Sequence, residues 1–321
     1  MIFHRKGIVL EKFQIVGVGY NCVDVICMVE DFPVEDSSTH ITKIVRHGGG
    51  ASATAVVAAS RLGSRCAFIG NLGYDSMSDN IISMMEEEGV CADHMVRRGD
   101  CWGLESFIMV NPENGSRTKF PQRDYNPAIT WDEGLREVIR NSQVVHLDGT
   151  HYENAINAAT IAKEYGVTVS LDGCSMQKDN GKNRALATLA DILIMNSKYP
   201  LRVSGEQDYD RALLEMSTWG DKKVIGCTLG DKGSRFVMDG KVVAFPAYKA
   251  PVVVDTTGCG DVFHGSFLNA YVSGMDTAGC IRYASVVASL KCAWPGGRAG
   301  IPDRDSVIEA LKLHMGVEKK E

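Results

Sequence analysis

Short apolar runs recur along the chain, and each is followed by a segment whose apolar residues have helical spacing. The runs cover residues 13–19, 66–69, 144–148, 167–172, 192–196 and 224–228, and helices are expected at about 51–62 and in a Met-rich segment ending near residue 88. Strands that alternate with helices are typical of βαβ units. The sequence therefore predicts an α/β fold with a doubly wound, mostly parallel sheet flanked by helices.

Polar residues stand at the ends of several of these runs. Asp148, Asp172, Asn196 and Thr228 each close a predicted strand. In open α/β sheets, ligands bind in the crevice at the carboxyl ends of the strands. We therefore expect these side chains to face a ligand site.

Two stretches, about 21–46 and 104–120, have alternating character instead. Residues 111–115 between apolar runs form a hairpin turn signal. Together the stretches predict a small separate β-sheet, while a later hairpin around Asp239 and Gly240 would extend the main sheet. We expect one domain over residues 1–321.

The segment Asp255-Thr256-Thr257-Gly258-Cys259-Gly260-Asp261 places a Gly-x-Gly turn directly before a predicted helix. The preceding residues 252–254 are interpreted as a strand end. Free amides at a helix N-terminus suit a phosphoryl group. Asp261 could cap the helix or accept a proton from an attacking hydroxyl, and its position alone leaves both roles open.

With the following Val-Phe-His-Gly, this segment resembles the C-terminal signature of the ribokinase (PfkB-type) family of sugar and nucleoside kinases. The resemblance implies a ribokinase-like fold, with Asp261 as catalytic base and Gly258, Cys259 and Gly260 as an anion hole for the transferred phosphoryl group of ATP. It also implies that the two alternating stretches form a lid over the sugar. Asp255 and Thr257 are the predicted metal residues.

Three glycines at 48–50 lead into an Ala-rich helix, and they serve either a close ligand or tight packing of that helix. The segment resembles the N-terminal signature of the family, which implies that Gly49 and Gly50 lie against the sugar. Thr54 stands where the family usually has Asn, at a substrate-binding position. Asp24 could accept two hydrogen bonds from a vicinal diol, as the sugar-binding Asp of the family does, or it is a solvated loop residue.

The nucleotide is expected at residues 228–233, which resemble the Thr-x-Gly-x-x-Gly segment of the family and supply Thr228, Gly230 and Gly233. Asn196 matches the family's Asn-x-x-Glu motif, but Tyr199 replaces the Glu. Mg²⁺ would then be held through waters and other carboxylates, or in a different way. Residues 294–302 resemble the closing loop beside the adenine and a monovalent cation site, so K⁺ is a candidate cofactor.

The net charge of −6 provides no basic field for nucleic acid or an anionic membrane. The N-terminus lacks the apolar core of a signal peptide, so we expect a cytoplasmic enzyme. Ten scattered cysteines indicate small buried side chains rather than disulfides. Cys259 is either such a filler or, at a helix N-terminus, a thiol of lowered pKa whose alkylation would block phosphate binding. An exposed lid edge could pair two subunits.

The combined pattern of 48–55, 261–265 and 290–303 is most similar to sulfofructose kinase and neighbouring ketose kinases. We therefore expect a ketose, fructose-like or sulfofructose-like, or a pentose as substrate. Basic residues around the lid could bind a sulfonate or phosphate, or form a solvated surface: Lys43, Arg46, Lys119 and Arg123. A nucleoside kinase and a non-catalytic sugar or nucleotide sensor are the alternatives.

Overall fold

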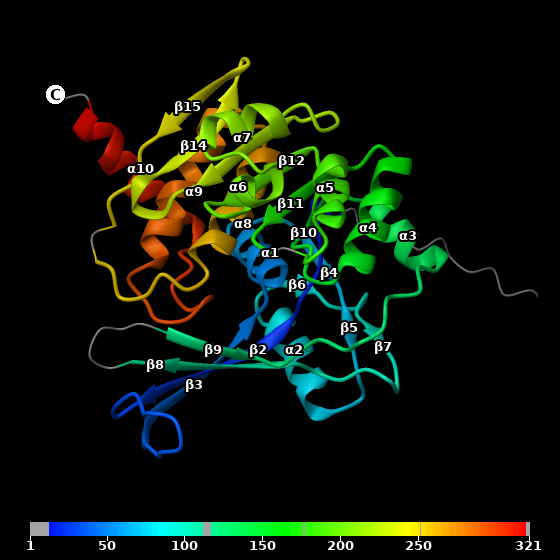
Figure 1. Ribbon diagram of the computed structural model, residues 1–321, viewed down its shortest axis with the longest axis vertical. Coiled ribbons are helices and arrows are strands. Elements are labelled where there is room, and N and C mark those ends of the chain that lie inside the picture. Colours follow the sequence, from blue (N-terminus) through cyan, green and yellow to red (C-terminus); the bar gives the residue numbers. More distant parts are fainter. Residues whose placement is uncertain (1–12, 112–116, 176, 251, 319–321) are drawn as a thin grey trace, which may run out of the picture.

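The computed structural model describes residues 13–111, 117–175, 177–250 and 252–318. A large sheet with helices on both faces forms the main body, and a smaller sheet lies beside it (Figure 1). The α/β class and the two-sheet arrangement predicted from the sequence are confirmed.

The main sheet has nine strands in the order β15-β14-β13-β12-β11-β10-β1-β4-β6. Strands from β13 to β6 are parallel, and β14 and β15 are antiparallel. The bounds are β1 (Ile15–Val18), β4 (Cys66–Ile69), β6 (Val90–Cys91), β10 (Val144–Leu147), β11 (Thr168–Gly173), β12 (Ile192–Asn196), β13 (Val224–Thr228), β14 (Ser234–Met238) and β15 (Lys241–Phe245). All six strands predicted from apolar runs are present.

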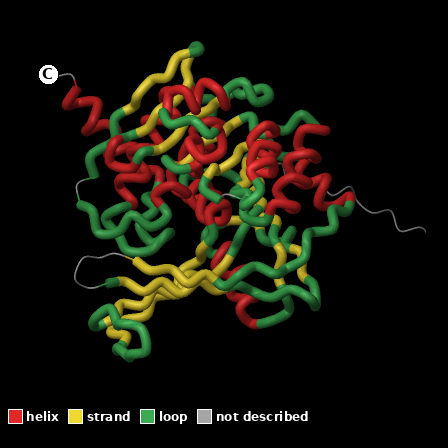
Figure 2. The backbone as a smooth tube through the Cα atoms, viewed as in Figure 1, coloured by secondary structure: helices red, strands yellow, loops and turns green. Residues whose placement is uncertain are grey.

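Helices cover both faces because successive strand residues point to opposite sides. Ile15 packs with α1, α2, α8 and α9, whereas Val16 packs with α3 to α7. Figure 2 shows the two helical layers. The bounds are α1 (Ala51–Arg61), α2 (Ser76–Glu86), α3 (Glu133–Arg140), α4 (Tyr152–Glu164), α5 (Asn180–Leu189), α6 (Tyr199–Ser204), α7 (Tyr209–Met216), α8 (Cys259–Val272), α9 (Thr277–Lys291) and α10 (Arg304–Glu318). In the described residues, no helix is long and apolar enough to cross a membrane.

The second sheet has the order β3-β2-β8-β9 and is built from the two alternating stretches. Its strands are β2 (Cys22–Val29), β3 (Ile41–Gly49), β8 (Glu105–Val110) and β9 (Arg117–Pro121), and a separate pair is formed by β5 (Asn71–Leu72) and β7 (Val96–Arg97). Most of the predicted 111–115 turn lies outside the described residues. The lid role of this sheet and the single-domain organisation stay predictions.

The later hairpin has the local geometry that its sequence favours. Asp239 and Gly240 both have positive φ, 50° and 74°. Such values at both central residues define the tight turn that matches the twist of a β-hairpin. The turn joins β14 to β15 and extends the main sheet, as predicted.

The strand end predicted at residues 252–254 is wrong. The three valines are exposed and lie outside any strand. Val254 N–H donates to the carbonyl of Cys292 at 2.7 Å, so this backbone pairs with the end of α9 rather than with a sheet. β-branched composition favours a strand, but tertiary context decides the outcome here.

Helix α8 packs closely on α1 through Gly265. A Cβ atom built on Gly265 would lie 1.9 Å from the carbonyl oxygen of Ala55 and 2.9 Å from the Ala58 Cβ. The Ala55 backbone and the Ala58 side chain of α1 leave no room for a side chain at this position. This contact fixes the direction in which α8 leaves its N-terminus.

We expect Gly265→Ala to lower the free energy of unfolding by about 1–3 kcal/mol or more, because the added methyl overpacks a backbone contact. Urea denaturation followed by circular dichroism measures the change. Gly99→Ala is the matched control, since no heavy atom lies within 4 Å of its added Cβ. Equal stability of the two variants would contradict the proposed close contact.

Candidate active site

The N-terminus of α8 is open. Gly258 is its N-cap with φ 75°, and no side chain caps the helix. An added Cβ on Gly258 would lie 2.8 Å from the carbonyl oxygen of Gly297, so both conformation and space require glycine. The first amides of a helix have no intrahelical acceptor. Among the described residues, the amides of Gly258 and Gly260 have no protein acceptor, whereas the Cys259 amide donates to the carbonyl of Thr256 at 3.3 Å. The two open amides can therefore serve an external anion.

Asp261 lies in the first turn of α8, half-buried, and does not act as the helix cap. No hydrogen bond to its carboxylate occurs among the described residues. Burial and then the nearby Asp172 raise the pKa of Asp261 to about 7, against the opposing charges of His264 and Lys119. A carboxylate with a pKa near neutrality is suited to general-base work.

Two other carboxylates near the same edge of the sheet are fully engaged. Asp148 accepts backbone hydrogen bonds from Tyr20 at 3.0 Å, Ser52 at 3.2 Å and Thr150 at 2.8 Å. This arrangement joins β1, α1 and β10, and it gives Asp148 a structural role.

Asp172, at the end of β11, pairs with the Nε2 atom of His264 at 3.2 Å, and both side chains are buried. Although burial opposes it, His264 lowers the pKa of Asp172. Of these three acids, Asp261 alone is left without a protein partner in the described structure.

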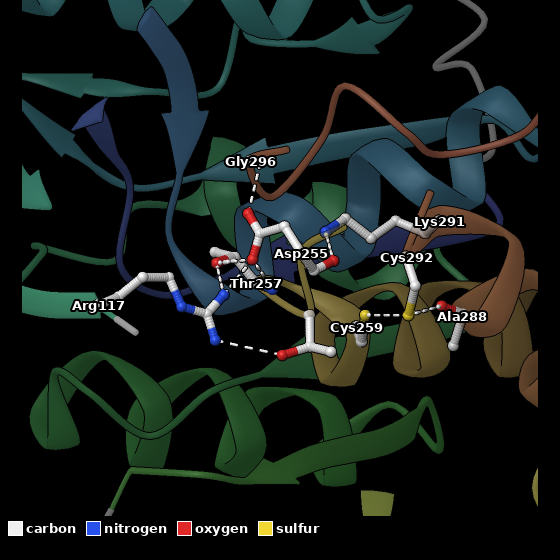
Figure 3. Close-up of polar contacts among 9 residues, drawn as sticks. Arg117, Asp255, Thr257, Cys259, Ala288, Lys291, Cys292 and Gly296 are labelled. Atoms are coloured by element: carbon white, nitrogen blue, oxygen red, sulfur yellow. Dashed lines mark hydrogen bonds and ion pairs between the residues drawn. The ribbon is translucent and has the colours of Figure 1, made fainter. Parts of the chain in front are cut away.

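Asp255 lies at the centre of a polar network (Figure 3). Its Oδ2 accepts from Gly296 N–H at 2.7 Å, and its Oδ1 accepts from the amide and hydroxyl of Thr257, both at 2.8 Å. Arg117 of β9 donates to Asp255 Oδ1, to Thr257 Oγ1 and to Thr256 Oγ1. The second sheet is thus linked directly to the loop before α8.

These contacts bear on the predicted metal role of Asp255 and Thr257. Both Asp255 oxygens already accept hydrogen bonds, and the Thr257 hydroxyl donates to one of them. Across the described ranges, no group of three or more His, Cys, Asp or Glu residues could hold a metal ion. The metal role stays a prediction that this arrangement does not support.

The predicted nucleotide residues meet at one edge of the sheet. Asn196 and Thr228 are register partners at the ends of β12 and β13. Gly230 begins a 3-10 turn, and Gly233 closes it with φ 84°. The Asn196 side chain accepts hydrogen bonds from the amides of Lys198 and Tyr199, 2.9 and 3.0 Å away. It therefore shapes the loop, and nucleotide binding by this group stays a prediction.

Asp24 of β2 is half-buried and leans against Gly49, where a Cβ would lie 2.5 Å from its Cγ atom. Burial raises the pKa of Asp24, while a hydrogen bond from Cys22 and the charges of Lys119 and Arg298 oppose the rise. A strand rather than a solvated loop therefore holds this carboxylate. Sugar binding by Asp24 stays a prediction.

The glycines at 48–50 are accounted for by packing within the protein. A Cβ on Gly48 would meet Arg298, and one on Gly50 would meet the carbonyl oxygen of Tyr20. Contact of Gly49 and Gly50 with a sugar stays a prediction.

Thr54 is fully buried, and its hydroxyl accepts from Arg298 Nε at 3.3 Å. Arg298 also donates to the carbonyl of Gly49 at 3.0 Å. The hydroxyl that replaces the family's Asn is thus used by an internal arginine. Thr54 as a substrate ligand stays a prediction without support from these contacts.

Cys259 and Cys292 form a thiol pair with 3.3 Å between their sulfur atoms (Figure 3). Either sulfur could donate in this hydrogen bond, which raises the pKa of Cys259 and lowers that of Cys292. Of the two alternatives for Cys259, this pairing favours the small buried side chain over a thiol of lowered pKa, and an effect of its alkylation on phosphate binding stays a prediction. In this pair the more readily ionised thiol is Cys292.

A small cavity of about 80 Å³ lies between the second sheet and the loop before α8. Apolar side chains of β2 and β8, Ile26, Met28 and Ile108, line one side, and Arg117 and Asp255 line the other. The opening thus borders both the predicted lid and the predicted phosphate site.

Three cationic residues at the site were not identified from the sequence as working parts: Arg117, Lys291 and Arg298. Arg117 could be identified only from the tertiary structure, because it contacts Asp255, which is 138 residues away in the sequence. The sequence contained a clue to Lys291, because a lysine in the apolar end of a helix is unusual. An arginine between the glycines of the 296–300 segment was a similar clue for Arg298.

An open helix N-terminus with an unpaired carboxylate beside it is suited to phosphoryl transfer, because it can hold the phosphoryl group next to a base. Residues 12–304 match the family described as pfkB family carbohydrate kinase. The chain belongs to this family, and it is a phosphotransferase of the sugar or nucleoside kinase type.

Relatives act on different acceptors. A nucleoside kinase from Methanothermobacter thermautotrophicus is 26% identical over 317 residues, covering 96% of this chain and 98% of the relative. A ketohexokinase from Mus musculus is 24% identical over 295 residues, covering 89% and 98%. The structure of Arabidopsis thaliana ribokinase complexed with ribose and ATP superposes with a TM-score of 0.82 at 26% identity, covering 94% of this chain and 99% of that one.

The pKa of Asp261 predicts the pH dependence of turnover. Only the deprotonated carboxylate can take a proton, and its fraction grows as pH rises through the pKa of about 7. We expect kcat/KM to rise about tenfold per pH unit at low pH and to level off above pH 7. Initial rates across buffers of constant ionic strength measure this profile. A flat profile from acid to neutral pH would contradict the role of Asp261.

Proposed function

We propose that the chain transfers the γ-phosphoryl group of ATP to a hydroxyl of a ketose, fructose-like or sulfofructose-like, or of a pentose. The observation that carries the proposal is the Asp261 carboxylate, which has no protein partner in the described structure and stands beside the open amides of α8. A base and an anion site must be adjacent for a hydroxyl to attack a phosphoryl group.

In this mechanism Asp261 orients the acceptor hydroxyl and takes its proton as the new O–P bond forms. The amides of Gly258, Cys259 and Gly260 bind the oxygens of the phosphoryl group, and the helix dipole favours their negative charge. Asp24 holds the sugar by accepting hydrogen bonds from its hydroxyls. Closing of the second sheet would exclude water and so limit ATP hydrolysis.

ATP would lie along the ends of β12 and β13, near Asn196, Thr228, Gly230 and Gly233, with its terminal phosphate toward α8. Because the described part of the chain holds no cluster of three or more His, Cys, Asp or Glu residues that could bind a metal, a Mg²⁺ ion would be held mainly by ATP phosphates and waters. Bound there, the ion would neutralise phosphate charge. A cytoplasmic location and a dimer through the second sheet are further expectations.

A ketose is favoured over a nucleoside by the surroundings of Asp24. Tyr20 and Phe32 are the aromatic residues near Asp24 in the sequence. Burial raises the pKa of Tyr20 and the charge of Asp24 adds to the rise, so Tyr20 is close to Asp24, whereas Phe32 is exposed. A nucleobase would favour an aromatic wall, since stacking on aromatic rings is its usual mode of binding. Because one of the relatives is a nucleoside kinase, nucleosides are included in the experiment below.

The first experiment measures ATP consumption with pentoses, ketohexoses, 6-sulfofructose, sugar phosphates and nucleosides. We expect one class of sugar to respond, and Asp261→Asn to lower kcat at least about 100-fold, the usual scale for a positioned base. ATP affinity should stay nearly unchanged, since the amides remain. Asp221→Asn is the matched control, because this exposed residue precedes β13 at the opposite edge of the sheet.

If only nucleosides stimulate ATP consumption, the acceptor is a nucleoside and not the proposed sugar. Near-normal turnover of Asp261→Asn would overturn the assignment of the base. ATP binding without phosphorylation of any compound would favour the sensor alternative over the proposed reaction.

Lys119 of β9 provides a test for an anionic sugar. Its charge opposes the rise that burial causes in the pKa values of Asp24 and Asp261, so it lies near the predicted sugar. We expect Lys119→Met to raise KM about tenfold for a sulfonated or phosphorylated ketose, the scale of a charge-assisted hydrogen bond, and much less for the uncharged ketose. Lys241→Met, at the exposed start of β15 on the outer edge of the main sheet, is the control. If KM rises equally for the charged and the uncharged ketose, Lys119 does not bind an anionic group of the substrate.

A further inference from the structure

Lys291, the last residue of α9, has no exposed surface. Its Nζ atom donates a hydrogen bond to the carbonyl oxygen of Asp255 at 3.1 Å (Figure 3). A buried lysine is rare in proteins unless its charge has a partner. We therefore expect Lys291 to have a function at the loop that contains Asp255.

The loop and the end of α9 are joined at several points. Val254 and Asp255 both donate from their amides to the carbonyl of Cys292, at 2.7 and 3.1 Å. Gly296 donates to the Asp255 carboxylate, and Gly258 lies against Gly297. Lys291 thus lies at the junction that positions the anion hole, with a main-chain carbonyl, a carboxylate and two thiols around its ammonium group.

This environment does not fit the monovalent cation that the family resemblance implies near the closing loop. Main-chain carbonyl oxygens are the typical protein ligands of K⁺. Here the carbonyl of Asp255 already accepts from an ammonium group. A second cation at the same carbonyl would be repelled by the first at short range in a buried setting. The side chain and a bound K⁺ would therefore exclude each other.

We propose that the Lys291 ammonium group is a built-in cation that holds the Asp255–Gly260 loop in its anion-binding conformation. The lysine acts as a positioning residue, through the Asp255 carbonyl, and adds positive charge beneath the amides. The chain accordingly needs no added monovalent cation. For turnover the inference rests on the proposed kinase function, whereas its effect on ATP binding is measured without any sugar.

The first test uses the wild-type chain. The dissociation constant of a non-hydrolysable ATP analogue with Mg²⁺ is measured by calorimetry in tetramethylammonium buffer, with and without K⁺. We expect the two constants to agree within about twofold, since no cation site is open. An increase in affinity of about tenfold or more on adding K⁺ would overturn the inference. Thermal stability should likewise be unchanged by K⁺.

The second test replaces the lysine by a neutral side chain of similar length. We expect Lys291→Met to weaken binding of the analogue, and to lower kcat with the sugar identified above, by about 10- to 100-fold, the scale of a lost hydrogen bond to a charged group. Added methylammonium, NH₄⁺ or K⁺ should restore part of both. If the lysine only fills space, the added cations will restore neither binding nor turnover, and that result contradicts the inference. A variant that binds the analogue and turns over like the wild type contradicts it as well.

Lys222→Met is the matched control. This lysine is also partly buried and donates to main-chain carbonyls, those of Thr188 and Trp219, but it lies before β13 at the far edge of the sheet. It should show neither the loss nor the rescue. If Lys291→Met does not fold, the wild-type K⁺ titration still decides. A chain that binds the analogue independently of K⁺ but phosphorylates no sugar contradicts the proposed function alone.

Discussion

The Asp255 carboxylate joins three segments that are far apart in the sequence. It accepts hydrogen bonds from Thr257 in its own loop, from Gly296 after α9 and from Arg117 on β9. Although burial opposes it, the hydrogen bonds from Gly296 and Thr257 lower the pKa of Asp255, so the group remains ionised at neutral pH. The conformation of the loop before α8 and its contact with the second sheet both depend on this anion.

The acids near the carboxyl edge of the main sheet illustrate how environment separates identical groups. Asp148 is held by backbone amides and Asp172 by His264, so each is used within the protein. Asp261 has no such partner among the described residues, and burial beside Asp172 raises its pKa to about 7. Pairs of carboxylates with different surroundings are a common way to obtain a base that works at neutral pH.

The cationic side chains near the site also differ in their surroundings. Arg298 is buried beneath the Gly-rich segment and Lys291 beneath the anion-hole loop, where each binds main-chain carbonyls. Arg117 and Lys119 belong to β9 and face the site from the second sheet. Two of the charges therefore stabilise the loops beneath the site, and two face it from the second sheet.

The sequence by itself determined the elements that depend on local pattern. The period of apolar residues marked α8 and the parallel strands other than the short β6. Asp239-Gly240 marked a hairpin because few residues tolerate positive φ. The motif at 255–261 indicated a phosphate site because glycine turns and helix N-termini act locally.

Only the tertiary structure decided which of the candidate side chains are free. Residues 252–254 have strand composition, yet they pair with the end of α9. The Thr54 hydroxyl and the Asp255 carboxylate are used by Arg298 and Arg117, and the thiol pair assigns its lower pKa to Cys292. Each outcome depends on a partner more than 30 residues away, and the energy of such a contact is set by burial and distance, which a sequence pattern does not encode.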